Sequence, residues 1–466
     1  MDAADTRREG AAARPPASRR FLEFAGRNAD CRSRESFASI FRDNPLKVMS
    51  PQPWPLFVDK GALSEAERAS VGLDRLVKSV PERFFGNDPA RIAAFYGSAT
   101  PHFAETVLAE PNGIHGALTR GDFLDGAEGL QCLEINSGGF VGGWQLQALE
   151  RLYLEHPVIA RFLAEEGLRA SHRNTIRLML RHIVRDTLRA GVWKGGPLHL
   201  AMIIHPHRPI QVAIHSSELY NREYRAALAE VRPGLEGELF LCGYADLADG
   251  PEGLSFRGQR VHAILEQHDG QLDARGFRCF KAGTVNLYSG PITQLLSDKR
   301  NLALLSESAT SADFSAAERD LLARHLPWTR LVLDRDTTWR GRRCRLPELL
   351  ADSREQFVLK KATSLGGQDV HLGKSASPER WEALLRQALA DPGWIAQELV
   401  EPRPYDFLSP GGQVVHYDVV WGLFSFGTTF GGAFLRLQPS DRGGIVNTAG
   451  GAEVTLLLEV EPVTPG

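Results

Sequence analysis

The sequence of 466 residues lacks the features of several protein classes. Its five cysteines stand far apart and form no C-x-x-C pair, which excludes zinc ribbons and thioredoxin-like redox motifs. No run approaches the roughly 18 uncharged apolar residues of a membrane span, and the N-terminus has no apolar stretch typical of a secretory signal. The net charge of −3 argues against a general nucleic-acid-binding surface. We therefore expect a soluble cytoplasmic protein with reduced cysteines.

The overall composition is that of an ordinary globular protein, with 43% hydrophobic and 24% charged residues. At roughly 150 residues per domain, the length predicts two or three domains. Residues 1–20 mix Arg, Ala and Pro without periodicity, which predicts a disordered tail. Apolar residues recur at helical spacing from about 60 to 110 and again from 146 to 191, so we expect helices in both segments.

An alternation of strand-like and helical runs predicts a small α/β layer over 197–290, followed by a helix near 291–307. From residue 356 onward the predicted order is a strand (FVLKKA), a glycine loop (SLGGQD), a returning strand (VHLGK), a helix and a further strand (WIAQELV). Ser377 as the N-cap and Pro378 as the first helical residue define the start of that helix.

Residues 120–136 carry the first pattern that indicates chemistry, because they form a predicted hairpin with the motifs R-x-D and E-x-N. Alternate side chains of a strand share a face, so the hairpin sets Asp122, Glu134 and Asn136 beside one another. Two carboxylates and an amide oxygen suit a hard cation such as magnesium. The alternative is a surface hairpin with solvated charges. Glu134 lies in an apolar strand, where an unpaired carboxylate is costly, and this favours the metal-ligand interpretation.

The second pattern is Lys360, which ends an apolar strand and precedes a loop of small residues with Ser364, Gly366 and Gly367. Phosphate binding requires a fixed positive charge and backbone N–H groups that a ligand can approach closely, and this segment offers both. It is not a P-loop, because the lysine precedes the glycines. The alternative is a simple turn between two strands.

Taken together, the strand, lysine, glycine loop, returning strand, capped helix and the run Gln397–Val400 resemble the nucleotide-binding half of an ATP-grasp ligase. The metal hairpin precedes the lysine strand by more than two hundred residues. That order resembles the circularly permuted branch of the family, typified by glutathionylspermidine synthetase and eukaryotic glutathione synthetase. The resemblance covers roughly residues 110 to 460. It implies an α/β (α+β) ATP-grasp fold, ATP and Mg²⁺ as cofactors, and an ATP-dependent carboxylate–amine ligase that forms an amide or peptide bond through an acyl phosphate.

The resemblance also implies roles for individual residues. Asp122, Glu134 and Asn136 would hold magnesium, and Arg120 and Arg436 would lie near the transferred phosphate. The nucleotide would contact Lys299, Lys360, Ser364, Gly366, Gly367, Gln397, Glu398, Leu399, Val400 and Glu401. After the tail the chain would divide into a helical N-terminal region (21–110), the metal-binding hairpin with its helices (111–195), a pre-ATP-grasp-like α/β domain (196–310) and the nucleotide-binding subdomain (311–466).

Three features depart from the family pattern. Lys361 stands where the family usually has proline, and the loop Ser-Leu-Gly-Gly lacks the charged residue that the branch often has. The interval from Lys299 to Lys360 is long and holds five arginines over residues 335–345. Two alternatives therefore stay open: a catalytically degenerate ATP-grasp module that only binds nucleotide, and a phosphotransferase with a non-carboxylate acceptor. The arginine-rich stretch could grip an anion or be a solvated loop. The expected partners are ATP and small-molecule or peptide carboxylates and amines, with no membrane or nucleic acid, and a dimer is left open.

Overall fold

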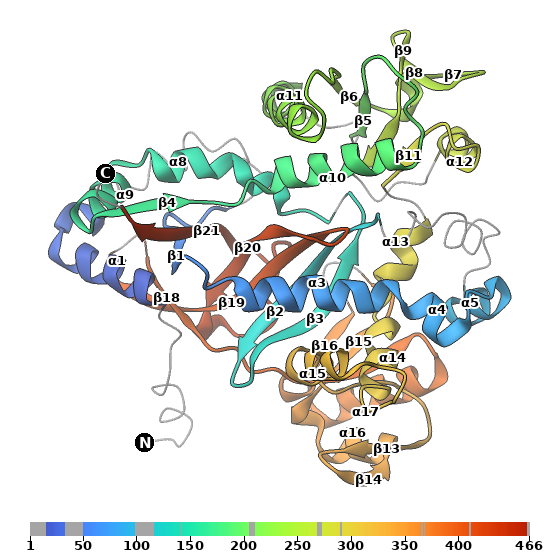
Figure 1. Ribbon diagram of the computed structural model, residues 1–466. Helices are drawn as coiled ribbons and strands as arrows, with labels where there is room; N and C mark the ends of the chain where they lie inside the picture. The colour runs from blue at the N-terminus through green and yellow to red at the C-terminus, as the bar shows by residue number, and fades with distance from the viewer. Residues whose placement is uncertain are drawn as a thin grey trace.

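The computed structural model describes residues 15–32, 50–97, 116–139, 141–204, 210–267, 273–288, 291–364, 367, 369–409 and 412–463. Figure 1 shows three layers from top to bottom: a small α/β unit, a large central sheet, and a smaller unit that contains β15 and β16. Within these ranges, no helix combines the length and the apolar character needed to cross a membrane.

The central sheet runs in the order β1-β21-β20-β19-β2-β3, and two further strands, β18 and β4, pair with β19 and β21. Only the β1–β21 pairing among these is parallel. Its strands are β1 (Leu56–Asp59), β2 (Leu118–Gly126), β3 (Gly129–Ser137), β4 (Leu168–Ser171), β18 (Tyr405–Leu408), β19 (Val414–Phe426), β20 (Thr429–Pro439) and β21 (Glu453–Pro462).

Helices cover both faces of this sheet, which explains why its central strands are apolar at successive positions. Successive side chains of a strand point to opposite faces. Leu423 of β19 accordingly packs in the core that contains α3 (Ser64–Lys78), and Phe424 packs in the core that contains α10 (Thr175–Arg189). Figure 1 shows α3 in front of the sheet and α10 above it. The hairpin β2–β3 confirms the one predicted over 120–136.

The lower unit is an antiparallel sheet in the order β12-β17-β15-β16 with helices packed on it. Ser377 accepts a hydrogen bond from the Arg380 N–H, and Pro378 opens the helix, as the sequence predicts. One face of that helix buries Trp381 and Leu384 against the sheet. The elements are β12 (Thr329–Leu331), β15 (Phe357–Lys361), β16 (Val370–Leu372), β17 (Trp394–Glu398), α16 (Leu346–Asp352) and α17 (Pro378–Ala390).

The upper unit confirms the predicted small α/β layer, because its main sheet is parallel in the order β11-β10-β5-β6. A short antiparallel sheet, β7-β8-β9, lies beside it. The elements are β5 (Leu200–Ile203), α11 (Ile210–Val231), β6 (Leu239–Cys242), β7 (Leu247–Gly250), β8 (Gly253–Phe256), β9 (Gln259–Arg260), β10 (Ala263–Glu266), α12 (Ala274–Lys281) and β11 (Asn286–Leu287).

The remaining helices include most of those predicted over 60–110 and 146–191. Residues 98–110 of the first segment lie outside the described residues. These helices are α1 (Pro16–Arg27), α4 (Val80–Phe85), α5 (Pro89–Tyr96), α8 (Glu150–Leu154), α9 (Pro157–Glu165), α13 (Pro291–Leu296), α14 (Arg300–Glu307) and α15 (Ala316–His325).

Two expectations from the sequence are wrong in detail. The predicted tail over 1–20 is incorrect for residues 16–20, which belong to α1; Phe21 of this helix packs against Phe57 and Phe162. Residues 1–14 lie outside the described part of the chain. The single helix expected near 291–307 is two helices, because Asp298 separates them and accepts the backbone N–H of Arg300.

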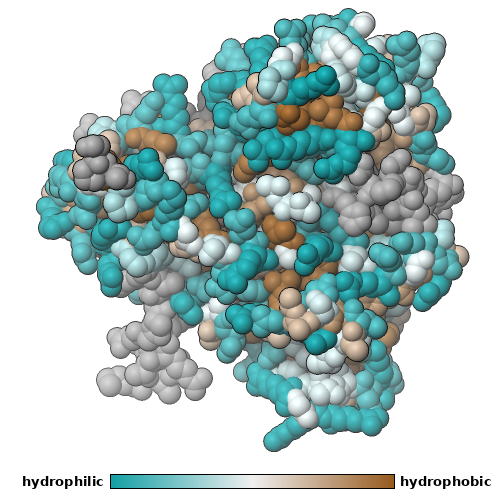
Figure 2. Space-filling view, in the orientation of Figure 1, coloured by the Kyte–Doolittle hydropathy of each residue, from teal (hydrophilic) through white to brown (hydrophobic). Residues whose placement is uncertain are grey.

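The surface is consistent with these cores. Figure 2 shows a mainly hydrophilic face on which hydrophobic residues form a few separate patches. Among the described residues, Val414 and Val463 are the large hydrophobic side chains that are exposed. Val414 lies at a cleft that gathers most of the residues singled out from the sequence.

Candidate active site

A cleft of about 1680 Å³ lies between the β2–β3 hairpin, the sheet of the lower unit and the segment that follows β20. Most of the candidate residues line it: Arg120, Asp122, Glu134, Asn136, Lys360, Gly367, Gln397, Glu398, Leu399, Val400, Glu401 and Arg436. Lys299 and Ser364 are not in its lining but are hydrogen-bonded to each other next to it. Gly366 lies outside the described residues.

The hairpin register brings the three proposed metal ligands together. Asp122 pairs with Glu134 across the strands, and a β-bulge follows Asp122. The Asn136 amide donates to Asp122 Oδ2 at 3.2 Å and to Glu134 Oε1 at 3.4 Å. The three side chains therefore meet around one point, as alternation along two strands predicts.

The donor set fits magnesium only when further oxygens are supplied. Among the described residues, no group of three or more His, Cys, Asp or Glu side chains could hold a metal ion. Oxygen ligands at about 2.1 Å in octahedral geometry lie about 3 Å apart, close to the spacing in this cluster. Rotation of the Asn136 amide presents its oxygen to the same point. Asp122, Glu134 and Asn136 therefore fit a cation that takes its other ligands from water and phosphate.

Asp122 is buried between two guanidinium groups. Arg120 donates through Nε to Oδ1 at 2.8 Å and through Nη2 to Oδ2 at 3.0 Å, and Arg436 Nη2 lies 2.7 Å from Oδ2. Burial alone would raise the pKa of Asp122, but Arg120 and Arg436 outweigh it and hold that pKa well below its usual range. Arg120 also donates to the carbonyls of Val141 and Gly142, so it ties β2 to the segment after β3.

The Phe434 ring packs against both guanidinium groups. Arg120 lies 5.6 Å and Arg436 lies 5.9 Å from its centroid. The ring fits because glycines flank it: a Cβ added at Gly143 or at Gly422 would lie 2.2 Å from Phe434 Cε1. Contacts this short are not tolerated, so the two glycines leave room for the ring that positions the arginines.

Replacing Gly422 with alanine should therefore lower the free energy of unfolding by about 1–3 kcal/mol, the usual cost of overpacking a buried site. Urea denaturation would measure this change. Gly276→Ala is the matched control, because the nearest atom to a Cβ there is 3.4 Å away and the residue lies in α12. Equal stability of the Gly422→Ala variant and the parent protein would contradict the packing argument.

Two buried lysines, Lys299 and Lys360, contact strand β3 of the β2–β3 hairpin. Lys299 Nζ lies 3.3 Å from Glu134 Oε2 and donates to the Ser364 carbonyl at 2.7 Å, so it connects the hairpin to the glycine loop. Lys360 Nζ donates to Gln397 Oε1 at 2.6 Å and to the Leu133 carbonyl at 3.1 Å. Burial, with a contribution from the nearby Lys299, lowers the pKa of Lys360 to about 8, although Glu134 opposes the change.

The charges of this cluster favour an anion. Arg120, Arg436, Lys299 and Lys360 supply four positive charges, and Asp122 and Glu134 supply two negative ones. Five of these groups are linked by ion pairs and by the Asn136 amide, and Lys360 contacts the carbonyl of Leu133 beside Glu134. The six groups sum to a local charge of +2. A polyanion such as a chain of phosphates would neutralise it.

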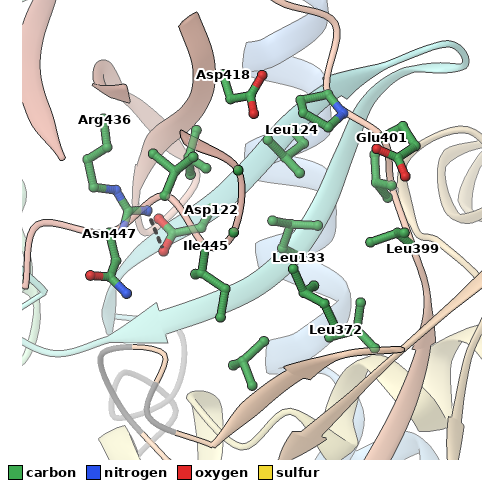
Figure 3. A pocket seen from close by; sticks show the side chains of 18 of the residues that line it. Asp122, Leu124, Leu133, Leu372, Leu399, Glu401, Asp418, Arg436, Ile445 and Asn447 are labelled. Carbon is green, nitrogen blue, oxygen red and sulfur yellow. Dashed lines mark ion pairs between the residues drawn. The ribbon is translucent and has the colours of Figure 1, made fainter. Parts of the chain in front are cut away.

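Another side of the cleft includes an apolar wall. Figure 3 shows Leu133, Leu372 and Leu399 gathered on one side of the cleft, while Arg436 and Asp122 lie on another. The Glu398 N–H donates to the Trp328 carbonyl and the Leu399 N–H to the Gln356 carbonyl. These two N–H groups are already used, so a ligand bound at this side of the cleft would meet backbone groups at Val400 or Glu401.

The glycine-rich segment between β20 and β21 resembles the C-terminal strand pair of the ATP-grasp family in sequence, but sequence reasoning missed its place in the lining of the cleft. Gly367 has φ +75°, and a Cβ there would lie 3.0 Å from Asn447 Nδ2 and 3.6 Å from Ile445 Cγ2. The glycine loop and this distant segment therefore meet over the cleft. Asp418 was missed as well, although it lines the cleft and accepts a hydrogen bond from the Ser440 hydroxyl at 2.6 Å. The Gly443-Gly444 and Gly450-Gly451 pairs were the available signal for the closing segment.

The arginine-rich stretch forms a hairpin, β13 (Asp336–Trp339) and β14 (Arg342–Arg345), whose cations mostly pair with carboxylates. The pairs are Arg335–Glu307, Arg340–Glu398, Arg343–Asp336 and Arg345–Asp334. These pairings favour neither a broad anion grip nor a freely solvated loop. One of them, Arg340–Glu398, reaches the cleft.

Comparisons with known proteins place the fold. No family model matches the sequence, and no curated protein matches it. The chain is similar to the apo structure of a glutathione synthetase-like effector from Globodera pallida, with a TM-score of 0.54 and 11% sequence identity. The match covers 94% of this chain and 96% of that one. The chain therefore has a mixed α/β fold like that of a glutathione synthetase-like protein.

Proposed function

We propose that the protein is an ATP-dependent carboxylate–amine ligase with a circularly permuted ATP-grasp fold. The observation that carries this proposal is the convergence of Asp122, Glu134, Asn136 and Lys360 in one cleft, with Lys299 next to it in contact with Glu134. The hairpin and the lysine strand are far apart in sequence but adjacent in space, since Lys360 donates to the carbonyl of Leu133. The fold shared with a glutathione synthetase-like protein is consistent with this proposal.

The nucleotide would lie along the cleft with its base against the apolar wall of Leu133, Leu372 and Leu399. Its phosphates would reach Lys299 and Lys360, which are already held by hydrogen bonds and lose little freedom on binding. The loop with Ser364 and Gly367 would cover the phosphates and exclude water.

Asp122, Glu134 and Asn136 would hold magnesium between the hairpin and the phosphates. Bound there, the ion would neutralise charge on the phosphate oxygens during transfer. Arg120 and Arg436 would also neutralise charge on the phosphate oxygens. Asp122 and the Phe434 ring fix both guanidinium groups before substrate binds.

The proposed reaction has two steps. A carboxylate oxygen of the acid attacks the γ-phosphorus of ATP, ADP leaves, and an acyl phosphate forms. The amine then attacks the acyl carbon, loses a proton, and inorganic phosphate leaves as the amide bond forms. Phosphorylation is needed because the oxygen of a free carboxylate is a poor leaving group. The positive groups of the cleft would stabilise the negative charge that develops in both steps.

The local charge of +2 predicts an order of binding. We expect Mg²⁺ alone to bind weakly, because Arg120 and Arg436 already occupy the carboxylate of Asp122. A non-hydrolysable ATP analogue should strengthen the binding, since its phosphates reverse the local charge and add ligands. Calorimetric titration of Mg²⁺ with and without the analogue would measure this difference. Equal affinities in the two titrations would contradict the assignment.

A direct test of the function is incubation with ATP, Mg²⁺, candidate acids and hydroxylamine. Hydroxamate together with ADP supports the ligase. Nucleotide binding without turnover across a wide panel of acids would support a degenerate module instead. A stable phosphorylated product without an amide would point to a phosphotransferase.

A further inference from the structure

The segment between β17 and β18, residues 399–404, joins the lower unit to the central sheet. Its first residues, Leu399 and Val400, line the cleft, whereas Asp122 and Glu134 on another side of the cleft belong to the central sheet. The central sheet and the lower unit have separate hydrophobic cores. Units of this kind move relative to each other unless contacts between them prevent it. A fixed spacing across the cleft therefore depends on contacts between the two units.

Arg403 makes such a contact with the end of strand β2. Its backbone N–H donates to the Asp125 carbonyl at 2.7 Å, and its Nη2 donates to the Gly126 carbonyl at 3.0 Å. The Tyr405 hydroxyl donates to Asp125 Oδ2 at 2.8 Å. Burial and the charge of Asp125 raise the pKa of Tyr405, so this hydroxyl remains a donor. Residues 403–405 are thus hydrogen-bonded to the last two residues of β2.

Gly126 allows the segment to approach the hairpin this closely. A Cβ added there would lie 3.0 Å from Val400 Cγ1 and 3.3 Å from the Glu401 carbonyl oxygen. A side chain at this position would therefore push the segment away from the hairpin. Asp122 lies four residues before Gly126 on the same strand, which at about 3.3 Å per residue is about 13 Å from the contact. The strand that carries this proposed metal ligand is thus the strand that the segment contacts.

We propose that Arg403 is a positioning residue that holds the β2–β3 hairpin and the apolar wall of the cleft at a fixed spacing, so that both ends of a nucleotide bind at once. This inference rests on the proposed function, in which the base contacts the wall and the phosphates contact Lys299 and Lys360. Arg403 acts through the hairpin and through Leu399 and Val400, and it need not touch the ligand.

The fixed spacing contributes to affinity in a definite way. A ligand that spans two prearranged subsites binds more tightly than its separate parts, because the second contact costs little further translational and rotational freedom. If the wall and the hairpin shift relative to each other, the ligand must also order the two units. Part of the advantage of the whole nucleotide over its fragments is then lost, although each fragment still binds to its own side.

Arg403→Gln tests this role, because it removes the bond to the Gly126 carbonyl and the cation that lies 3.9 Å from Asp125 Oδ2. We expect the Kd of a non-hydrolysable ATP analogue with Mg²⁺ to rise about three- to tenfold, the scale of one net hydrogen bond. The Kd values of adenosine and of tripolyphosphate with Mg²⁺ should stay unchanged, since each fragment needs one side of the cleft. Competition against a fluorescent ATP analogue would measure all three affinities.

Gly126→Val should give the same pattern, because it displaces the segment from the hairpin side of the contact, and a β-branched residue suits a strand. Arg91→Gln is the matched control. The Arg91 side chain also donates to backbone carbonyls, those of Phe84 and Phe85, but these residues do not line the cleft. This variant should bind the three ligands as the parent protein does.

Parent-like affinity of the Arg403→Gln variant for the ATP analogue would overturn this inference alone. An equal weakening of adenosine or tripolyphosphate binding would also overturn it, because Arg403 would then act on that part of the ligand directly. Failure of the parent protein to bind the ATP analogue would overturn the proposed function and this inference together.

Discussion

Replacing Glu134 with glutamine should lower ATP-dependent turnover by at least about a hundredfold, the scale of removing a preorganised electrostatic group. The substitution keeps the shape of the side chain but removes the charge that lies 3.3 Å from Lys299. It also removes one of the two carboxylates of the proposed metal site. The side chain is 27% exposed, so the fold should tolerate the change. Steady-state ADP release, with circular dichroism to verify folding, would measure the effect.

Glu128→Gln supplies a closely matched control for this experiment. Glu128 lies in the turn of the same hairpin and is exposed, so the same substitution there removes a charge without touching the cleft. Its turnover should equal that of the parent protein. A folded Glu134→Gln variant with near-parent activity would refute the metal assignment.

Asp122→Asn has the largest expected effect on folding. The carboxylate is buried between Arg120 and Arg436, and its removal leaves two buried guanidiniums without a counter-charge. Breaking a buried ion pair in this way costs about 3–5 kcal/mol of unfolding free energy. Urea denaturation would measure the loss, and turnover should disappear as well. Asp320→Asn, in the exposed pair with Arg324, should leave stability nearly unchanged.

The stability that Asp122 contributes should depend on pH. The pKa of Asp122 in the folded state lies well below its unfolded value of about 3.9. Its contribution to stability is therefore fully present above about pH 4 and is lost as the pH falls toward the folded pKa. The difference in unfolding free energy between Asp122→Asn and the parent protein should be constant near neutrality and should shrink in acid. A difference that grows in acid would contradict the ion-pair explanation.

Local patterns carried much of what could be predicted. Alternation and a turn signal were enough for the β2–β3 hairpin, because both strands and their connection are contiguous in sequence. Capping chemistry was enough for α17, since Ser377 and Pro378 act within one helical turn. The convergence of Asp122, Glu134 and Asn136 also followed from strand geometry within a single hairpin.

Features that depend on distant contacts could not be predicted in the same way. The apolar face of helix α1 is hard to recognise in a sequence rich in arginine and alanine. The helix is stabilised by contacts of Phe21 and Phe24 with Phe162 of α9. The break at Asp298 depends on the side-chain and backbone bonds of Arg300, which apolar periodicity does not report. The residues around Arg436 do not indicate that it pairs with Asp122. The two residues meet because strand β19 lies between β20 and β2 in the sheet.

The parallel pairing of β1 with β21 has a consequence for the growing chain on the ribosome. Leu56 is aligned with Leu457, so β1 gains its neighbour in the sheet only after about 400 further residues have been synthesised. At 5–20 residues per second, that interval lasts about 20–80 s. During it, the backbone N–H and C=O groups of β1 lack the strand that pairs with them, and an unpaired strand can associate with other chains. A transcript truncated before residue 453 would yield a polypeptide that never completes this sheet.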